Sequence, residues 1–288
     1  SAIWADVQRK RAGLLESDLL TEEEDSERQT EARDALLSSF GPAYEAIIAW
    51  AEEERLSAPE VATGIGAQEG GDEYYAHLLA QQTTTDLSAD EIHTIGLNEV
   101  ARLRNEMLGI MDQVEFEGDL QAFFEEVRTG EWNYYPDTDE GRQAYIDDAT
   151  AAIDNLKTLL PKYFGLLPKA DLIVKRVDAF RERDGAAQHY YAGTPDGSRP
   201  GIYYAHLSDM TAMPKNQLEV IAYHEGLPGH HMQISIAQEL EGVTQFQTQI
   251  GFTAYAEGWG LYSEKLASEM HGTYADAYQQ CGRLSREI

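Results

Sequence analysis

Apolar residues recur every three or four positions along most of the chain, which is the spacing of one face of an α-helix. This pattern predicts helices over 42–56, from Ser88 to about Ile110, over about 140–164 and from Lys215 to the C-terminus. The start at Ser88 is the clearest, because Ser88-Ala89-Asp90-Glu91 has the spacing of a capping box. An apolar face of about six turns follows it.

Between residues 165 and 215 the helical spacing is lost. The segments 172–174, 189–191 and 202–206 are short, rich in β-branched and aromatic residues, and separated by Gly and Pro. Such segments are typical of strands joined by turns. The predicted fold is therefore mainly α with a small β-sheet, in the α+β class.

Composition excludes several classes of protein. The chain carries 51 acidic and 22 basic residues, for a net charge of −29, so its surface repels phosphate backbones and nucleic-acid binding is not expected. No apolar run approaches the ~18 residues that a transmembrane helix needs, and the mean hydropathy is −0.47. The single cysteine, Cys281, excludes an intramolecular disulfide and a Cys-based zinc finger.

The two ends of the chain suggest a piece of a longer protein. The N-terminus has neither a Met nor the basic and apolar regions of a secretory signal. Residues 283–288 have a helical pattern without a Gly or a cap to stop it. The sequence leaves the compartment open between the cytoplasm and an extracytoplasmic location, and it leaves the oligomeric state open.

The candidate chemistry centres on Tyr223-His224-Glu225-Gly226-Leu227-Pro228-Gly229-His230-His231-Met232. The amphipathic segment 216–222 before it predicts that His224 and Glu225 lie on a helix. A His-Glu pair on a helix opens the metal motif of zinc hydrolases, in which the His is a ligand and the Glu is the general base toward water.

The second His does not follow at the usual distance of four residues, where this chain has Pro228. Pro228-Gly229 cannot lie in a regular helix interior without a kink or bulge. A bulge of two or three residues would bring His230 or His231 one turn beyond His224. The Gly-His ending favours His230, whereas helical phase favours His231. The alternative is a histidine-rich helix end that binds no metal.

A third ligand is expected on a neighbouring helix. Glu257 lies 33 residues after His224 and suits the second of two antiparallel helices, and the small residues around it, Ala256, Gly258 and Gly260, allow helices to approach closely. Glu264 is two turns further on the same face, either as a partner for an imidazole N–H or as a surface carboxylate.

Aromatic residues mark another face of the same predicted helix. Tyr255, Trp259 and Tyr262 have the spacing i, i+4, i+7, and we expect them to pack in the core.

These motifs resemble the bacterial domain-of-unknown-function 885 family. The resemblance lies in residues 200–204, 224–233 and 257–264, and in the upstream segments 85–93 and 96–100. That family is similar to metallopeptidases of the His-Glu zinc superfamily, and its members are usually about twice this length. The resemblance implies a zincin-like, mainly helical architecture in which His224, one of His230 and His231, and Glu257 bind Zn²⁺ and Glu225 is the base.

The chain is thus divided into an acidic helical segment over 1–70, a helical region over 71–170, and the sheet with the metal-site helices over 171–288. The function we expect is zinc-dependent hydrolysis of a peptide or small amide substrate. In it, Glu225 takes a proton from water and passes it to the leaving amine.

The oxyanion needs a further donor, for which the candidates are the second histidine of the His230-His231 pair, Tyr203, Tyr204 and Tyr255. Segment 202–206 is expected to be the edge strand along which a peptide lies. The alternatives are a zinc esterase or non-peptide amidase, and a non-catalytic binding domain with a relic metal site.

Overall fold

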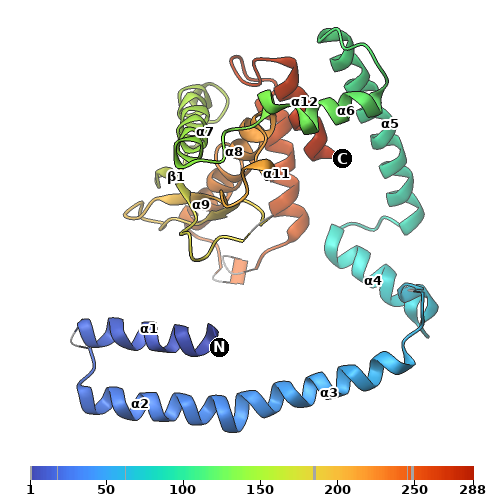
Figure 1. Cartoon of the computed structure of the whole chain (residues 1–288). Coiled ribbons are helices and arrows are strands. Elements are labelled where there is room, and N and C mark those ends of the chain that lie inside the picture. Colours follow the sequence, from blue (N-terminus) through green and yellow to red (C-terminus); the bar gives the residue numbers. More distant parts are fainter. Residues whose placement is uncertain (1, 18, 62, 184–185, 245, 248–249) are drawn as a thin grey trace. The chain divides into compact units, whose positions relative to one another are not determined.

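The computed structural model of the chain describes residues 2–17, 19–61, 63–183, 186–244, 246–247 and 250–288. The chain divides into two compact units, Ser1–Gly71 and Asp72–Ile288. It is mainly helical and has one three-stranded sheet (Figure 1), which confirms the predicted α+β class. Within the described ranges, no helix combines the length and the apolar character needed to cross a membrane.

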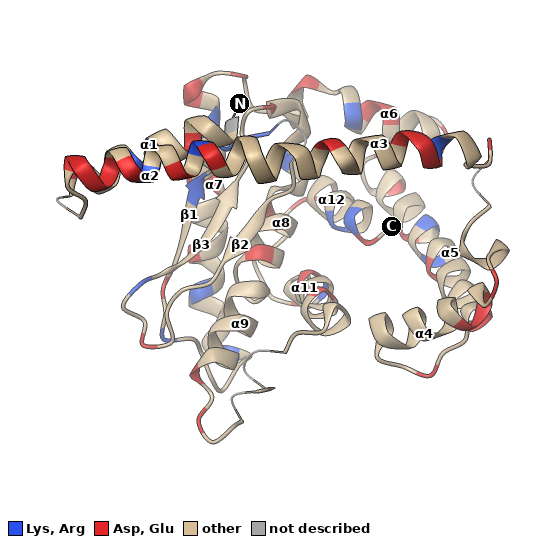
Figure 2. Ribbon diagram, turned by 90° about the horizontal axis from the view of Figure 1, so that it is seen from below, with Lys and Arg blue, Asp and Glu red and all other residues tan. Residues whose placement is uncertain are grey.

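The described residues of the first unit form three α-helices: α1 (Ala2–Glu16), α2 (Glu22–Ala35) and α3 (Gly41–Ser57). Thr21 and Glu24 form a capping box at the start of α2. The acidic run that follows lies in the first turn (Figure 2), where negative charge is favourable toward the helix dipole. Asp25, the buried member of this run, pairs with Arg11 of α1.

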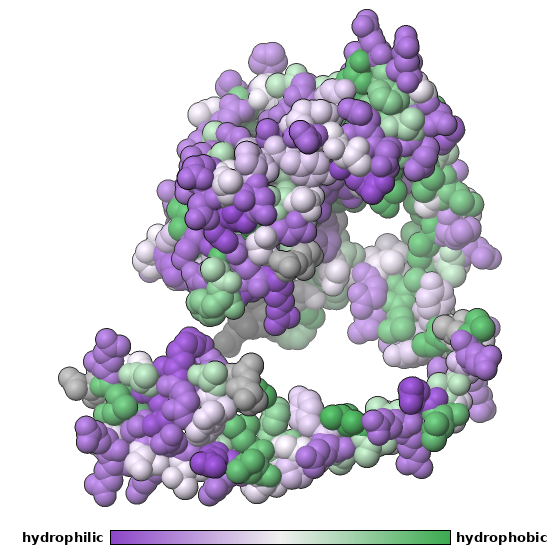
Figure 3. Space-filling view, in the orientation of Figure 1, coloured by the Kyte–Doolittle hydropathy of each residue, from purple (hydrophilic) through white to green (hydrophobic). Residues whose placement is uncertain are grey.

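The apolar positions that predict α3 do not form a buried face. Ile47, Ile48 and Trp50 are all more than half exposed, and Figure 3 shows apolar residues between polar ones on the outside of this unit. The spacing therefore predicts the helix correctly, although these side chains are not buried within the first unit.

Eight further helices are described from Gly71 onward: α4 (Gly71–Thr83), α5 (Ala89–Gln113), α6 (Leu120–Thr129), α7 (Asp139–Leu159), α8 (Leu218–Glu225), α9 (His230–Glu239), α11 (Thr253–Ala267) and α12 (Ala277–Glu287). Ser88 and Glu91 form the predicted capping box of α5. Only the C-terminal half of its apolar face is buried, at Leu103, Met107 and Ile110. Helix α7 ends earlier than expected, because a 3₁₀ turn with Pro161 follows Leu159.

The sheet contains the three predicted strands, β1 (Leu172–Arg176), β2 (His189–Tyr191) and β3 (Gly201–Ala205), in the order β1-β3-β2. β1 runs parallel to β3 and β2 runs antiparallel to it. The expectation that segment 202–206 forms an edge strand is therefore wrong, because β3 is paired on both sides. The edge strands are β1 and β2.

Helix α8 lies at the centre of the second unit. Seven of its eight residues are buried, and it contacts α7, α11 and α12. Its side chains share one core with α7, the sheet and α9, in which Tyr145 and Tyr203 are fully buried and their hydroxyl oxygens lie 2.8 Å apart. Because α8 is packed on several sides, the positions of His224 and Glu225 in its last turn are fixed.

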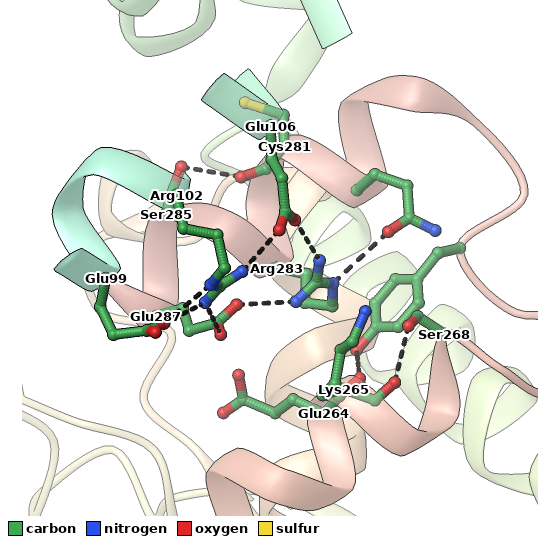
Figure 4. A network of polar contacts seen from close by, with 12 residues as sticks. Glu99, Arg102, Glu106, Glu264, Lys265, Ser268, Cys281, Arg283, Ser285 and Glu287 are labelled. Atoms are coloured by element: carbon green, nitrogen blue, oxygen red, sulfur yellow. Dashed lines mark hydrogen bonds and ion pairs between the residues drawn. The ribbon is translucent and has the colours of Figure 1, made fainter. Parts of the chain in front are cut away.

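An ion-pair network fastens α12 to α5 (Figure 4). Arg102 Nη1 lies 2.6 Å from Glu106 Oε1, and Arg102 Nη2 lies 2.5 Å from Glu287 Oε1. The buried Arg283 contacts the same two carboxylates, with its Nη1 2.8 Å from Glu287 Oε2 and its Nη2 3.5 Å from Glu106 Oε2. Two guanidinium groups thus share two carboxylates between the helices.

Arg283→Ala should lower the free energy of unfolding by about 2–3 kcal/mol, because it removes the buried cation and leaves Glu106 and Glu287 with Arg102 as their one shared partner in this network. Urea unfolding followed by circular dichroism measures the change. Arg104→Ala, on the exposed side of α5, is the control and should change stability by less than about 0.5 kcal/mol. Equal effects of the two substitutions would show that the network contributes nothing.

Candidate metal centre

The site begins where the chain leaves one helix and enters the next. α8 ends at Glu225 and α9 starts at His230, and the four residues between them fold back over the last turn of α8. The Gly229 N–H donates to the Tyr223 carbonyl (3.0 Å), and the His231 N–H donates to the Gly226 carbonyl (3.1 Å). A Cβ on Gly229 would lie 1.9 Å from the His224 carbonyl oxygen, so only glycine fits there.

This break in the helix brings His230 beside His224. The two ring centroids are 4.6 Å apart and the rings are nearly perpendicular, at 86°. His231 lies elsewhere, with Nδ1 3.0 Å from the Tyr190 hydroxyl and Nε2 3.1 Å from the Ala170 carbonyl. Both of its ring nitrogens have partners in the protein, so of the two candidate histidines it is His230 that the structure brings to His224. Burial lowers the pKa of His231 to about 4.

Glu257, on α11, completes the cluster. Its Oε2 lies 3.4 Å from His224 Nε2 and its Oε1 lies 3.6 Å from His230 Nε2. One donor atom from each of the three residues can be chosen so that all lie within 4.8 Å of one another. This set could hold a metal ion.

Two residues of α11 fix the orientation of His224. Its Nδ1 lies 2.7 Å from Oε1 of the buried Glu264, so the ring donates Nδ1–H to that carboxylate and turns Nε2 toward Glu257. A Cβ on Gly260 would lie 2.6 Å from Cε1 of the same ring. Of the small residues near Glu257, Gly260 therefore makes the close approach, whereas Gly258 has open space around it.

The charges around the two imidazoles are mostly negative. Burial alone would lower the pKa of His224, but its hydrogen bond to Glu264 and the charges of Glu225, Glu264 and Glu257 outweigh this and raise it. Burial and the charge of His224 lower the pKa of His230. Three carboxylates near two imidazoles favour the binding of a cation among them.

Glu225 follows His224 directly and is 6 % exposed. Burial raises its pKa to about 7, although the charges of His224 and Arg286 act in the opposite direction. Its side chain lines a cleft together with Arg286 of α12 and with His206, which follows β3. Glu225 is thus the acidic group that joins the metal cluster to this cleft.

The three tyrosines proposed as oxyanion donors have other surroundings. Side chains alternate along β3, so Tyr204 points to the face opposite Tyr203, where it stacks on His189 with ring centroids 5.3 Å apart. Tyr203 itself is bound to Tyr145 in the core. Tyr255 is 65 % exposed and borders an apolar pocket along α9. None of these placements puts a phenol beside His224.

The expected burial of the aromatic face of α11 is also wrong. Tyr255 and Tyr262 are more than half exposed. Only Trp259 is partly covered, and its Nε1–H donates to the Pro228 carbonyl at 2.9 Å. The buried face of α11 is instead the one that carries Gly260 and Glu264, because this face packs against α8.

The residue that the sequence analysis missed is Tyr190. It pairs with Tyr203 across β2 and β3 and points to the same face of the sheet. Its hydroxyl contacts His231, which holds the start of α9 against the sheet. The alternation of side chains in the predicted strand 189–191 would have placed it there, but only once the register with β3 was known.

The chain belongs to the family described as bacterial protein of unknown function (DUF885), whose model matches residues 3–288. A search of curated proteins finds no match. A crystal structure of a putative lipoprotein from Colwellia psychrerythraea is similar, with a TM-score of 0.84 and 32% identity over 98% of this chain and 48% of that one. A putative lipoprotein of unknown function from Shewanella oneidensis shares the fold, with a TM-score of 0.64 and 18% identity over 93% and 49% of the two chains. This chain spans about half the length of each.

Gly260→Ala should weaken the binding of Zn²⁺, used as the probe, at least about tenfold, because the new methyl group displaces the His224 ring. Gly258→Ala is the matched control on the same helix and should leave affinity unchanged while raising helix stability by up to about 1 kcal/mol. Isothermal titration calorimetry measures both affinities. Unchanged affinity for Zn²⁺ in the Gly260 variant would show that metal binding does not require the His224 ring to lie against α11.

His230→Gln and His231→Gln form a second pair. The first should abolish tight binding of Zn²⁺ because it removes a donor of the cluster. The second should keep the metal and lower stability by about 1–3 kcal/mol, because it disrupts the contacts to Tyr190 and Ala170. Metal content by plasma mass spectrometry, together with thermal unfolding, distinguishes the two effects. If the His231 variant lost the metal and the His230 variant kept it, His231 and not His230 would be the ligand.

Proposed function

We propose that this member of the family is a zinc-dependent hydrolase of peptide or related amide bonds. The observation that carries the proposal is the convergence of His224, His230 and Glu257 beside the buried Glu225. Two imidazoles and a carboxylate are the protein ligands of a known class of catalytic zinc sites, and they suit zinc better than magnesium or calcium, which prefer oxygen ligands alone.

The spacing of the donor atoms supports this choice of metal. Ligands about 2.1 Å from a tetrahedral zinc ion lie ~3.4 Å from one another. The distances from Glu257 to His224 and to His230 are 3.4 and 3.6 Å. The carboxylate of Glu264 on the far nitrogen of His224 is the outer partner that zinc-binding histidines commonly have.

The cluster is open on one side, as a catalytic site requires. The side chain of Glu257 is 59% exposed, whereas those of His224 and His230 are each 11% exposed. Three protein ligands with one open position are typical of catalytic zinc sites, whereas structural sites have four protein ligands. The chemistry that zinc supplies in such a site is the acidification of water and the polarisation of a carbonyl group.

In this proposal Glu225 is the general base. It lies next to His224 on the last turn of α8 and is held by the core around that helix. It would take a proton from the attacking water and pass it to the leaving amine. The substrate would lie along the edge strand β2, since β3 is paired on both sides and the backbone N–H of Tyr190 in β2 lies close enough to lower the pKa of Glu225.

The arrangement of elements also supports a zincin-like architecture. A helix carries the His-Glu pair, a sheet lies beside it, and a second packed helix carries the glutamate ligand. The break between α8 and α9 is the departure from an unbroken motif helix, and it takes the second histidine onto the helix that follows.

Glu225→Gln should keep about one zinc per chain and lower the turnover of a fluorogenic peptide by about 10²–10⁴-fold, because the amide cannot accept the proton from water. Metal content and initial rates are measured on the same preparations. Glu269→Gln, at an exposed glutamate in the turn after α11, is the control and should change neither. Full turnover in the Glu225 variant would contradict the assignment of Glu225 as the base. Turnover of esters but not of peptides by the unchanged chain would contradict the proposed amide substrate and favour an esterase.

A further inference from the structure

A cleft of about 270 Å³ lies on the side of Glu225 that faces α12. Its walls include Arg286 from α12, Gln217 just before α8, and His206 and Ser208 after β3. We infer that this cleft binds a carboxylate group of the substrate. The inference rests on the proposed function only in treating the bound molecule as a substrate.

Arg286 is the group that would bind the anion. Acidic residues outnumber basic ones by 51 to 22 in this chain, yet Arg286 makes no ion pair with any described residue. Arg283, one turn earlier on the same helix, contacts two carboxylates (Figure 4). Arg286 nevertheless lines the cleft together with Glu225.

An unpaired guanidinium in such a position suits a carboxylate better than other groups. Its N–H groups match the two oxygens of a carboxylate in a planar, bidentate arrangement. Glu225 cannot be the carboxylate that pairs with Arg286 if it acts as the base toward water. The other charged residues of the cleft are Arg183 and Asp209, and the Asp209 carboxylate accepts hydrogen bonds from Thr211. The chain therefore holds a cation beside its proposed base, and a substrate carboxylate can supply the anion.

Two further polar groups of the cleft residues lack partners. His206 Nδ1 and Ser208 Oγ are buried, and neither has a hydrogen-bond partner in the part of the chain that the structure describes. Burial and the neighbouring His189 lower the pKa of His206, which favours the neutral ring. Buried polar groups usually have partners, and small rotations of these side chains would let a bound carboxylate supply them.

The size of the cleft indicates which carboxylate binds. At about 270 Å³ it is smaller than most ligand pockets, which have volumes of ~300–1,000 Å³. It suits the end of a peptide better than a longer segment. A carboxylate beside the base also lies close to the bond that is cleaved. The inference is thus that the chain removes C-terminal residues, with Arg286 binding the terminal carboxylate.

The test measures binding without metal and without turnover. The chain in EDTA is titrated with N-acetyl-Ala-Ala, with the C-terminal amide of this dipeptide, and with N-acetyl-Ala-Asp-amide, whose only carboxylate is on the side chain. Protein NMR follows each titration. The free acid should bind at least tenfold more tightly than its amide, and Arg286→Gln should remove that difference. Arg104→Gln, with the same change of charge on the exposed side of α5, should keep it.

Each other outcome has a defined meaning. Equal affinity of acid and amide would overturn the inference, as would a preference for the acid that persists in the Arg286 variant. Equal binding of the aspartyl amide and the free acid would support a carboxylate site but overturn its assignment to the chain terminus. Metal content does not enter this test, so failure of the zinc proposal and failure of the carboxylate proposal are distinguishable.

Discussion

The close return of the backbone over the last turn of α8 is the constraint on which the candidate site depends. Gly229 lies so near the His224 carbonyl that any side chain would push the loop away from α8, and His230 would move with it. On the opposite side, Gly260 lets the His224 ring lie directly against α11. The two histidines can therefore lie side by side because Gly229 and Gly260 have no side chains. The core around α8 holds the backbone of this helix in place.

The charges of the site follow from this packing. Glu257 and Glu264 contact the imidazoles of His224 and His230 in a partly buried region, where unbalanced negative charge is costly. A divalent cation among these groups would offset that cost. Glu225 follows His224 and lines the same cleft as Arg286, which has no ion pair among the described residues. In the proposed function, a carbonyl group of the substrate therefore meets the metal while a carboxylate meets the arginine, and the base lies between them.

The sequence predicts the helices and strands well because their signals are local. The capping box at Ser88 and the three β-rich segments each depend on a few neighbouring residues. The sequence could not decide the points that depend on contacts between distant segments. Whether His230 or His231 lies beside His224 depends on how residues 226–229 return over α8. Helical phase cannot predict this, because the helix is interrupted between Glu225 and His230. Likewise, Tyr204 and Tyr255 carry suitable chemistry, but Tyr204 stacks on His189 and Tyr255 is largely exposed, which depends on strand register and on the packing face of α11.

The most direct test of this account is a crystal of the zinc-loaded chain, with diffraction recorded on both sides of the zinc absorption edge. The account predicts one strong anomalous peak about 2.0–2.2 Å from a nitrogen of His224, a nitrogen of His230 and a carboxylate oxygen of Glu257, with His231 still bound to Tyr190. A peak bound by His231, or no peak near His224 at full zinc occupancy elsewhere, would contradict it.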